Sequence, residues 1–236
     1  MLIDLIQSGF NKDLLIQVLL SIPVILFSLT FHEVAHGYIA YRMGDTTARD
    51  LGRLTLNPIK HLDPIGSLLM LTVGYGWAKP VPINTRRFEN PKKGMALTAL
   101  AGPVSNFIIA TVSVAIYSLM VAALNVQAIA QAIVLNEGLL NLYRAIYLMF
   151  KLSAYLNVSL AVFNLIPLPP FDGSRIFYSF LPAKLYFAVM KYERYILIVF
   201  LALLYTGVVS LPISFITDMI IDLFDLIFGL IFGIGG

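Results

Sequence analysis

The sequence His32-Glu33-Val34-Ala35-His36 places two imidazoles and one carboxylate within a little more than one helical turn. On a helix, residues i and i+4 face the same side, so both imidazoles can bind one metal ion. Glu33 lies beside them, where its carboxylate can hold a water molecule at that ion and accept a proton from it. This spacing favours metal binding, although such a short pattern also arises by chance.

A catalytic zinc site needs three protein ligands and one open position, so the sequence must supply a third donor. The chain has no cysteine, and the remaining histidine, His61, stands beside Lys60 in a basic segment, where we expect a solvated side chain. Asp172 is the remaining candidate, because it follows three prolines and precedes Gly173, a combination that ends a helix and permits a tight turn. The alternative is that Asp172 only caps the following helix. Imidazole and carboxylate ligands favour zinc but also suit iron or cobalt.

Composition indicates that membrane helices hold these residues. The chain has 236 residues, of which 59% are hydrophobic and only 12% charged, against roughly half and a quarter in soluble domains. This excludes an ordinary soluble domain, and also a disordered chain, which needs low hydrophobicity and high charge. We expect an all-α polytopic membrane protein in a lipid bilayer. The net charge of +3 does not predict a nucleic-acid partner, because basic residues of membrane proteins mark the cytoplasmic face.

Long uncharged runs predict a single membrane domain over residues 1–236 with about four transmembrane helices, at 14–41, 95–124, 150–170 and 195–214. The only ionisable side chains of the first run are the two histidines and the glutamate. Each costs on the order of 2.5 to 3.5 kcal/mol to insert into a bilayer, so their clustering favours a shared metal ion.

Two further segments have weaker membrane signals. The glycine-containing apolar run within residues 50–90 is too short for a span, and we expect a re-entrant or short β-rich segment there. Near the C-terminus, Asp218, Asp222 and Asp225 share one helical face, which predicts an amphipathic helix at the membrane interface.

The distribution of basic residues predicts the orientation in the membrane. Nine of them lie between the first two spans: Arg42, Arg49, Arg53, Lys60, Lys79, Arg86, Arg87, Lys92 and Lys93. The positive-inside rule places this segment in the cytoplasm, although Arg144 and Lys151 then lie on the outer side. The first and third spans both run inward, so the two histidines and Asp172 are expected at a similar depth, toward the cytoplasmic side of the membrane.

With these elements located, the sequence resembles the site-2 protease family of intramembrane zinc metalloproteases over about residues 14–175. The segments FHEVAH, GWAKPVPIN followed by ALAGPVSNF, and NLIPLPPFDGSR carry the resemblance. They look most like the compact bacterial branch, without a PDZ or CBS domain. The resemblance implies regulated intramembrane proteolysis with one zinc ion per chain, bound by His32, His36 and Asp172, with Glu33 as the catalytic glutamate.

Two asparagines also match family positions. Asn164 matches an asparagine near the scissile peptide, where it can donate to the developing oxyanion or hold the substrate. The alternative is that its amide satisfies helix backbone freed by Pro167. For Asn106 we expect hydrogen bonds between helices, with the small residues Gly102 and Ser105 allowing close helix approach. Ser174 stands where the family usually has a second glycine.

The expected partner is a transmembrane protein substrate, whose helix must unwind locally before cleavage. Residues 79–84, held extended by prolines, are predicted to present a strand edge to it. A metal or proton transporter is the first alternative, which would favour inverted repeats and broken helices in matched halves. The second is a non-catalytic membrane adaptor, but a structural zinc site has no use for a water-activating glutamate.

Overall fold

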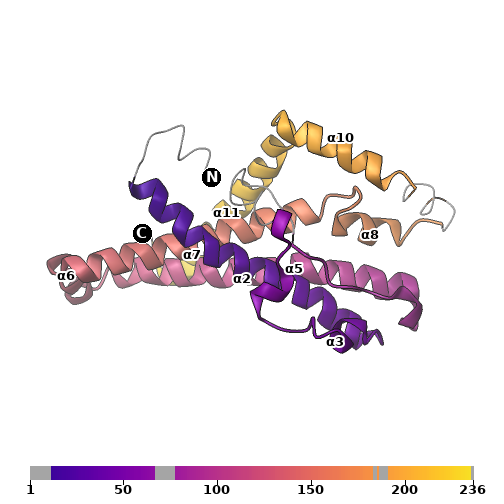
Figure 1. The fold of residues 1–236 in the computed structure, drawn as a ribbon. Helices are drawn as coiled ribbons and strands as arrows, with labels where there is room; N and C mark the ends of the chain where they lie inside the picture. Colours follow the sequence, from indigo (N-terminus) through magenta and orange to yellow (C-terminus); the bar gives the residue numbers. More distant parts are fainter. Residues whose placement is uncertain (1–11, 67–77, 183–184, 186–190, 235–236) are drawn as a thin grey trace.

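The computed structural model describes residues 12–66, 78–182, 185 and 191–234. Three long helices lie at its centre (Figure 1): α2 (Lys12–Arg42), α5 (Pro91–Ala123) and α7 (Glu137–Asn164). Each of them is long and apolar enough to cross a membrane. Helices α5 and α7 pack along each other, and α2 packs against both. The predicted helical architecture is therefore confirmed for the described residues, and three candidate membrane-spanning helices lie where the first three spans were predicted.

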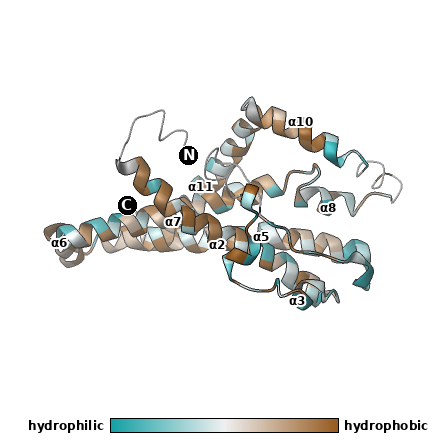
Figure 2. Cartoon of the chain, viewed as in Figure 1, coloured by the Kyte–Doolittle hydropathy of each residue, from teal (hydrophilic) through white to brown (hydrophobic). Residues whose placement is uncertain are grey.

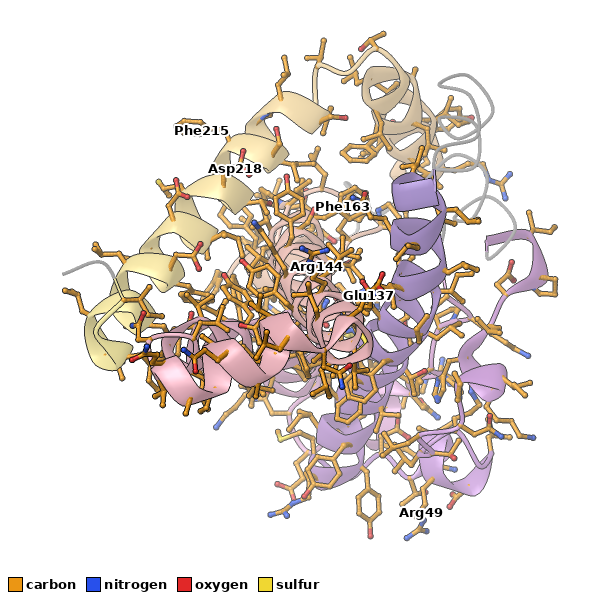
Figure 3. The ribbon with its side chains drawn as sticks, turned by 90° about the vertical axis from the view of Figure 1, so that its left-hand side faces the viewer. Arg49, Glu137, Arg144, Phe163, Phe215 and Asp218 are labelled. Atoms are coloured by element: carbon orange, nitrogen blue, oxygen red, sulfur yellow. The ribbon has the colours of Figure 1, made fainter. Side chains whose placement is uncertain are left out.

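The ends of α5 and α7 follow from local capping. The side chain of Asn90 accepts a hydrogen bond from the Lys93 amide, and proline occupies the first position of α5. Asn136 caps α7 in the same way, so this helix begins well before the predicted start at residue 150. Arg144 therefore lies on α7 itself (Figure 3), with its side chain exposed.

The predicted fourth span at 195–214 is divided into two helices. Helix α10 (Glu193–Tyr205) ends just before Gly207, which has a φ of +79°, and α11 (Ser210–Phe232) follows. A left-handed residue of this kind ends a helix, and glycine adopts it without a steric penalty. The 13 residues of α10 extend only about 20 Å, less than the hydrocarbon thickness. A fourth crossing remains a prediction.

Helix α11 packs against the central bundle. Its partly buried Ile221, Phe224 and Phe228 contact a cluster formed by Val114, Tyr117 and Ala154. The Tyr117 hydroxyl donates a hydrogen bond to Asp225, so part of the acidic face turns toward the bundle. Phe215 is exposed on the outer face of the same helix (Figure 3).

Short elements fill the polar end of the molecule, and Figure 2 shows hydrophilic residues gathered there, near α3 and the start of α5. They are α3 (Thr47–Asp50), η1 (Pro58–His61) and η2 (Thr85–Arg87), whereas α6 (Gln127–Leu135) lies at the opposite end of the bundle. Between residues 50 and 90, the described part of the chain contains one isolated bridge, Leu62 with Ala78. The predicted re-entrant segment falls largely on residues 67–77, outside the described residues.

The prediction for His61 was wrong. Its side chain is buried, and Nε2 lies 2.8 Å from the carbonyl oxygen of Thr55. The adjacent Lys60 is exposed, because neighbouring residues in a tight turn point to different sides. His61 therefore belongs to the packing of the basic segment.

Candidate metal centre

Helix α2 brings His32 and His36 to one face, as the i, i+4 spacing requires. Each residue is 6% exposed, and their Nε2 atoms are 3.0 Å apart. The two rings meet edge to face, with centroids separated by 4.5 Å. Both nitrogens therefore converge on one point inside the bundle, which is where a shared cation would lie.

Asp172 approaches the same point from a different part of the chain. It is the first residue of α8 (Asp172–Tyr178), which follows the proline-rich turn after α7. Its Oδ2 lies 3.2 Å from His32 Nε2 and 3.2 Å from His36 Nε2. The cap residue of α8 is Phe171, so the carboxylate of Asp172 faces the histidines instead of capping the helix.

Aromatic packing holds the turn that carries Asp172. The Phe171 ring contacts Phe163 at the end of α7 and Phe200 on α10, with both pairs of ring centroids 4.6 Å apart. Phe171, Phe200 and Leu204 form a buried cluster of their own. Phe171, the residue before Asp172, is thus held between α7 and α10.

The three donor atoms fit a zinc ion. The candidate ligand atoms all lie within 4.8 Å of one another, and the separations of 3.0 and 3.2 Å are close to the roughly 3.4 Å expected between ligand atoms of a tetrahedral zinc ion. Two imidazoles and one carboxylate also form the donor set of catalytic zinc sites that keep a fourth position open.

A backbone carbonyl of α5 orients the ring of His36. The carbonyl oxygen of Thr98 lies 2.7 Å from His36 Nδ1. With the proton on Nδ1 donated to this carbonyl, the lone pair of Nε2 is free for a metal ion. The Nδ1 of His32 is buried without a hydrogen-bond partner among the described residues. Sequence reasoning did not identify Thr98, because a contact through a backbone carbonyl leaves no mark in residue type.

Gly102 allows α5 to pass directly against both rings. A Cβ atom at this position would lie 2.5 Å from His32 Cε1 and 2.5 Å from His36 Nε2. Carbon atoms in normal contact are about 3.5 to 4.0 Å apart. Only glycine therefore fits here without displacing the histidines.

Gly173 has a similar role beside the carboxylate. A Cβ atom here would collide with the backbone carbonyl groups of Leu165 and Ile166. Its φ is not in the left-handed region, so the close approach of two backbone segments requires this glycine. This contact folds the turn back onto the end of α7 and directs Asp172 toward α2.

Glu33 follows His32 in the sequence but is not one of the three candidate ligands, His32, His36 and Asp172, which we call the triad. It accepts one hydrogen bond from a distant part of the chain. The backbone N–H of Val81 donates to its Oε2 at 2.8 Å. The other Glu33 oxygen forms no hydrogen bond with the described residues. The partner of Glu33 was not identified from the sequence.

The two candidate asparagines are bonded within their own helices. The side-chain amide of Asn164 donates to the carbonyl oxygen of Leu160 at 2.9 Å, and the residue is half-buried. Asn106 is fully buried; its Oδ1 accepts a hydrogen bond from Ser105 Oγ at 3.5 Å, and its amide nitrogen has no partner among the described residues. The expected hydrogen bond from Asn106 to another helix is therefore not formed there. That role belongs to Asn157, which donates to Ser28 on α2 at 2.8 Å.

Comparison with known proteins places this chain in a family. Residues 20–206 match the model of "Peptidase family M50". The chain is 41% identical, over 208 residues, to a Bacillus subtilis (strain 168) protein named "Putative zinc metalloprotease YwhC"; the match covers 86% of this chain and 90% of that protein.

More distant relatives carry a similar name. "Putative zinc metalloprotease Rip2" of Mycolicibacterium smegmatis is 28% identical over 156 residues, and the Mycobacterium tuberculosis protein of the same name is 29% identical over 152 residues. Each match covers 63% of this chain, which spans about half (52%) of the length of either relative. No solved structure matches the chain.

Proposed function

Because this chain belongs to peptidase family M50 and is a zinc metalloprotease of the site-2 protease type, we propose that His32, His36 and Asp172 bind its zinc ion and that Glu33 is the general base. The observation that carries the assignment is the convergence of three buried donor atoms from two distant parts of the chain. A structural zinc site would use four protein ligands, whereas three leave a position open for chemistry.

The proposed reaction is hydrolysis of a peptide bond. Zinc, when bound at the triad, supplies a Lewis acid that polarises the scissile carbonyl and makes water acidic enough to lose a proton near neutral pH. Glu33 takes that proton as the water oxygen attacks the carbonyl carbon. When the C–N bond breaks, Glu33 passes the proton to the leaving amine, so its carboxylate is regenerated.

Asn164 is proposed to contact the substrate near the scissile bond. Its amide donates to its own helix, but the residue is half-buried at the end of α7, three residues before Pro167, where the proline-rich turn begins. From this place a rotated side chain can donate to a developing oxyanion or to the substrate backbone. An Asn164→Asp variant keeps the size and loses the donor.

The proposed substrate is a transmembrane segment of another protein, cleaved toward the cytoplasmic side of the membrane. Two features support this orientation: the basic residues between α2 and α5, and the hydrophilic end of the bundle around α3 (Figure 2). The donor atoms lie within the membrane bundle, so a substrate helix must unwind locally to expose its backbone. We also propose a fourth crossing of the membrane, built from the helices after residue 193.

The test uses purified protein in liposomes with a labelled single-span model peptide whose alanine–leucine helix is interrupted by Gly-Pro. We expect the wild type to cleave this peptide, a zinc chelator to abolish cleavage, and Glu33→Gln to lose it while keeping its metal. Glu137→Gln is the matched control, because Glu137 is exposed at the start of α7. Cleavage by Glu33→Gln at the wild-type rate would refute the assignment.

A further inference from the structure

Residues 80–82 have a single backbone donor, the N–H of Val81, and it donates a hydrogen bond to Glu33. Proline has no N–H, so Pro80 and Pro82 leave the amide of Val81 as the only donor in this stretch. That N–H lies 2.8 Å from Glu33 Oε2. A hydrogen bond from a backbone amide to a carboxylate is charge-assisted and therefore stronger than a neutral one.

The segment is anchored on both sides of Val81. The Lys79 amide donates to the carbonyl oxygen of His61 at 2.8 Å, and the Arg53 guanidinium donates to the Lys79 carbonyl at 2.8 Å. On the other side, the Asn84 amide donates to Asp45 Oδ2 at 2.6 Å. Three hydrogen bonds thus fix the backbone from residue 79 to residue 84.

Asp45, the second anchor, is buried just after the end of α2. Burial raises the pKa of its carboxyl group, but hydrogen bonds from Thr47 and from the Asn84 amide, together with the nearby charge of Arg87, bring the pKa below its ordinary value. The anchor is therefore a carboxylate, with both oxygens occupied by donors.

The side chain of Val81 docks on α2 one turn beyond Glu33. A Cβ atom at Gly37 would lie 3.1 Å from Val81 Cγ1 and 2.7 Å from Leu54 Cδ2. Gly37 follows Glu33 by four residues and so lies on the same face. Its missing side chain lets the buried Val81 side chain approach the helix closely enough for its amide to reach Glu33.

We propose that the backbone N–H of Val81 is a positioning group for Glu33, and that residues 79–84 form a brace which holds the general base in its working orientation. This inference rests on the proposed role of Glu33. A glutamate side chain has three rotatable bonds and loses much conformational freedom when it is fixed. With Oε2 held by the brace, the other oxygen is left for proton transfer, and holding it in place favours the reaction.

The brace changes the predicted role of residues 79–84 as a strand edge for the substrate. A substrate strand would need free N–H groups as well as carbonyls. Residues 80–82 have only the Val81 donor, and Glu33 already accepts from it. We therefore assign residues 80–82 to the catalytic glutamate and not to substrate pairing.

The first test measures amide hydrogen exchange in zinc-free protein. Because Pro80 and Pro82 have no N–H, a peptide that ends at Pro82 reports the Val81 amide as a single exchanging site in mass spectrometry. We compare wild type, Glu33→Gln, which keeps an acceptor oxygen, and Glu33→Ala, which has none, with Glu137→Ala as control. We expect exchange at residue 81 to accelerate roughly tenfold or more only in Glu33→Ala. Equal rates in all four proteins would overturn the proposal.

The second test removes the donor and keeps the side chain. Replacing the Val81 amide by an ester, through the hydroxy-acid counterpart of valine, deletes the N–H; Val81→Ala keeps it. With the single-span model peptide as substrate, we expect the ester variant to lose roughly 10- to 100-fold in kcat with KM unchanged. Val81→Ala keeps the N–H but loses part of the docking side chain, so we expect a clearly smaller loss of kcat than in the ester variant. Zinc content and the thermal unfolding midpoint are measured on each variant.

Three kinetic outcomes contradict the proposal. A higher KM with normal kcat in the ester variant would show that the segment binds substrate, and a higher kcat would show that the hydrogen bond blocks the reaction. An equal loss of kcat in Val81→Ala would show that the Val81 side chain, and not its N–H, is what matters. If the ester variant does not fold, hydrogen exchange decides. If wild type and Glu33→Gln both fail to cleave, the proposed function is in question, whereas the exchange rates still report whether the brace holds Glu33.

Discussion

Replacing Gly102 by alanine tests whether close helix packing creates the metal centre. The added Cβ would lie 2.5 Å from atoms of both histidines, whereas normal contact requires about 3.5 Å or more. Either α5 or the two rings must therefore move by roughly 1 Å. Zinc sites tolerate deviations of only about 0.2 Å in ligand distance, so we expect zinc affinity to fall at least tenfold, as for the loss of a supporting group.

The assay for this variant is a competitive titration with a zinc-binding dye on detergent-solubilised protein. Gly229→Ala is the control, because a Cβ at that helical position would meet its nearest neighbour at 3.5 Å, an ordinary contact. We expect Gly229→Ala to bind zinc as the wild type does, with unchanged or slightly higher stability from better helix propensity. Wild-type zinc affinity in Gly102→Ala would refute the assignment of His32 and His36 as ligands packed beneath Gly102.

Three further changes have defined outcomes. Gly173→Ala should lower both the zinc content and the thermal unfolding midpoint, because the added Cβ collides with backbone carbonyl groups that cannot move aside. Wild-type values for both measurements would contradict this. Asn157→Ala should lose about 1 kcal/mol of unfolding free energy by removing the bond to Ser28, measured by denaturant titration, and an effect near zero would show that the bond is dispensable. The stabilisation from Asp45, whose folded pKa is below the ordinary 3.8, should be complete above about pH 5 and decline as the pH falls below 3.8 toward the folded pKa, because the unfolded state then binds more protons. Unfolding of wild type and Asp45→Asn at several pH values checks this; a difference that declines near pH 6 would contradict it.

The local features of the site are predictable from sequence because they depend on helix periodicity. The spacing of His32 and His36 fixes their common face, and the prolines before Asp172 end the preceding helix where the carboxylate is needed. The parallel direction of the first and third spans predicts that these groups reach a similar depth. The structure brings all three together.

The groups that support the site were not predictable, because they act through backbone atoms or through the absence of a side chain. The Thr98 carbonyl and the Val81 amide exist at almost every position of a chain, and only the packing of α2 against distant segments selects these two. His61 was misjudged for a related reason: a charged neighbour in sequence does not determine the direction of a side chain in a turn. The division of the fourth predicted span at Gly207 depends on one backbone conformation, which hydropathy does not report.

The central claim is that His32, His36 and Asp172 form a catalytic zinc site with Glu33 as the general base. The most direct test measures the zinc content per chain of four purified proteins: wild type, His36→Ala, Asp172→Ala and Glu33→Gln. We predict close to one zinc ion per chain in wild type and Glu33→Gln, and a large loss in both ligand variants. Full zinc content in Asp172→Ala, with loss in His36→Ala, would show that the third ligand is another residue and would contradict the account.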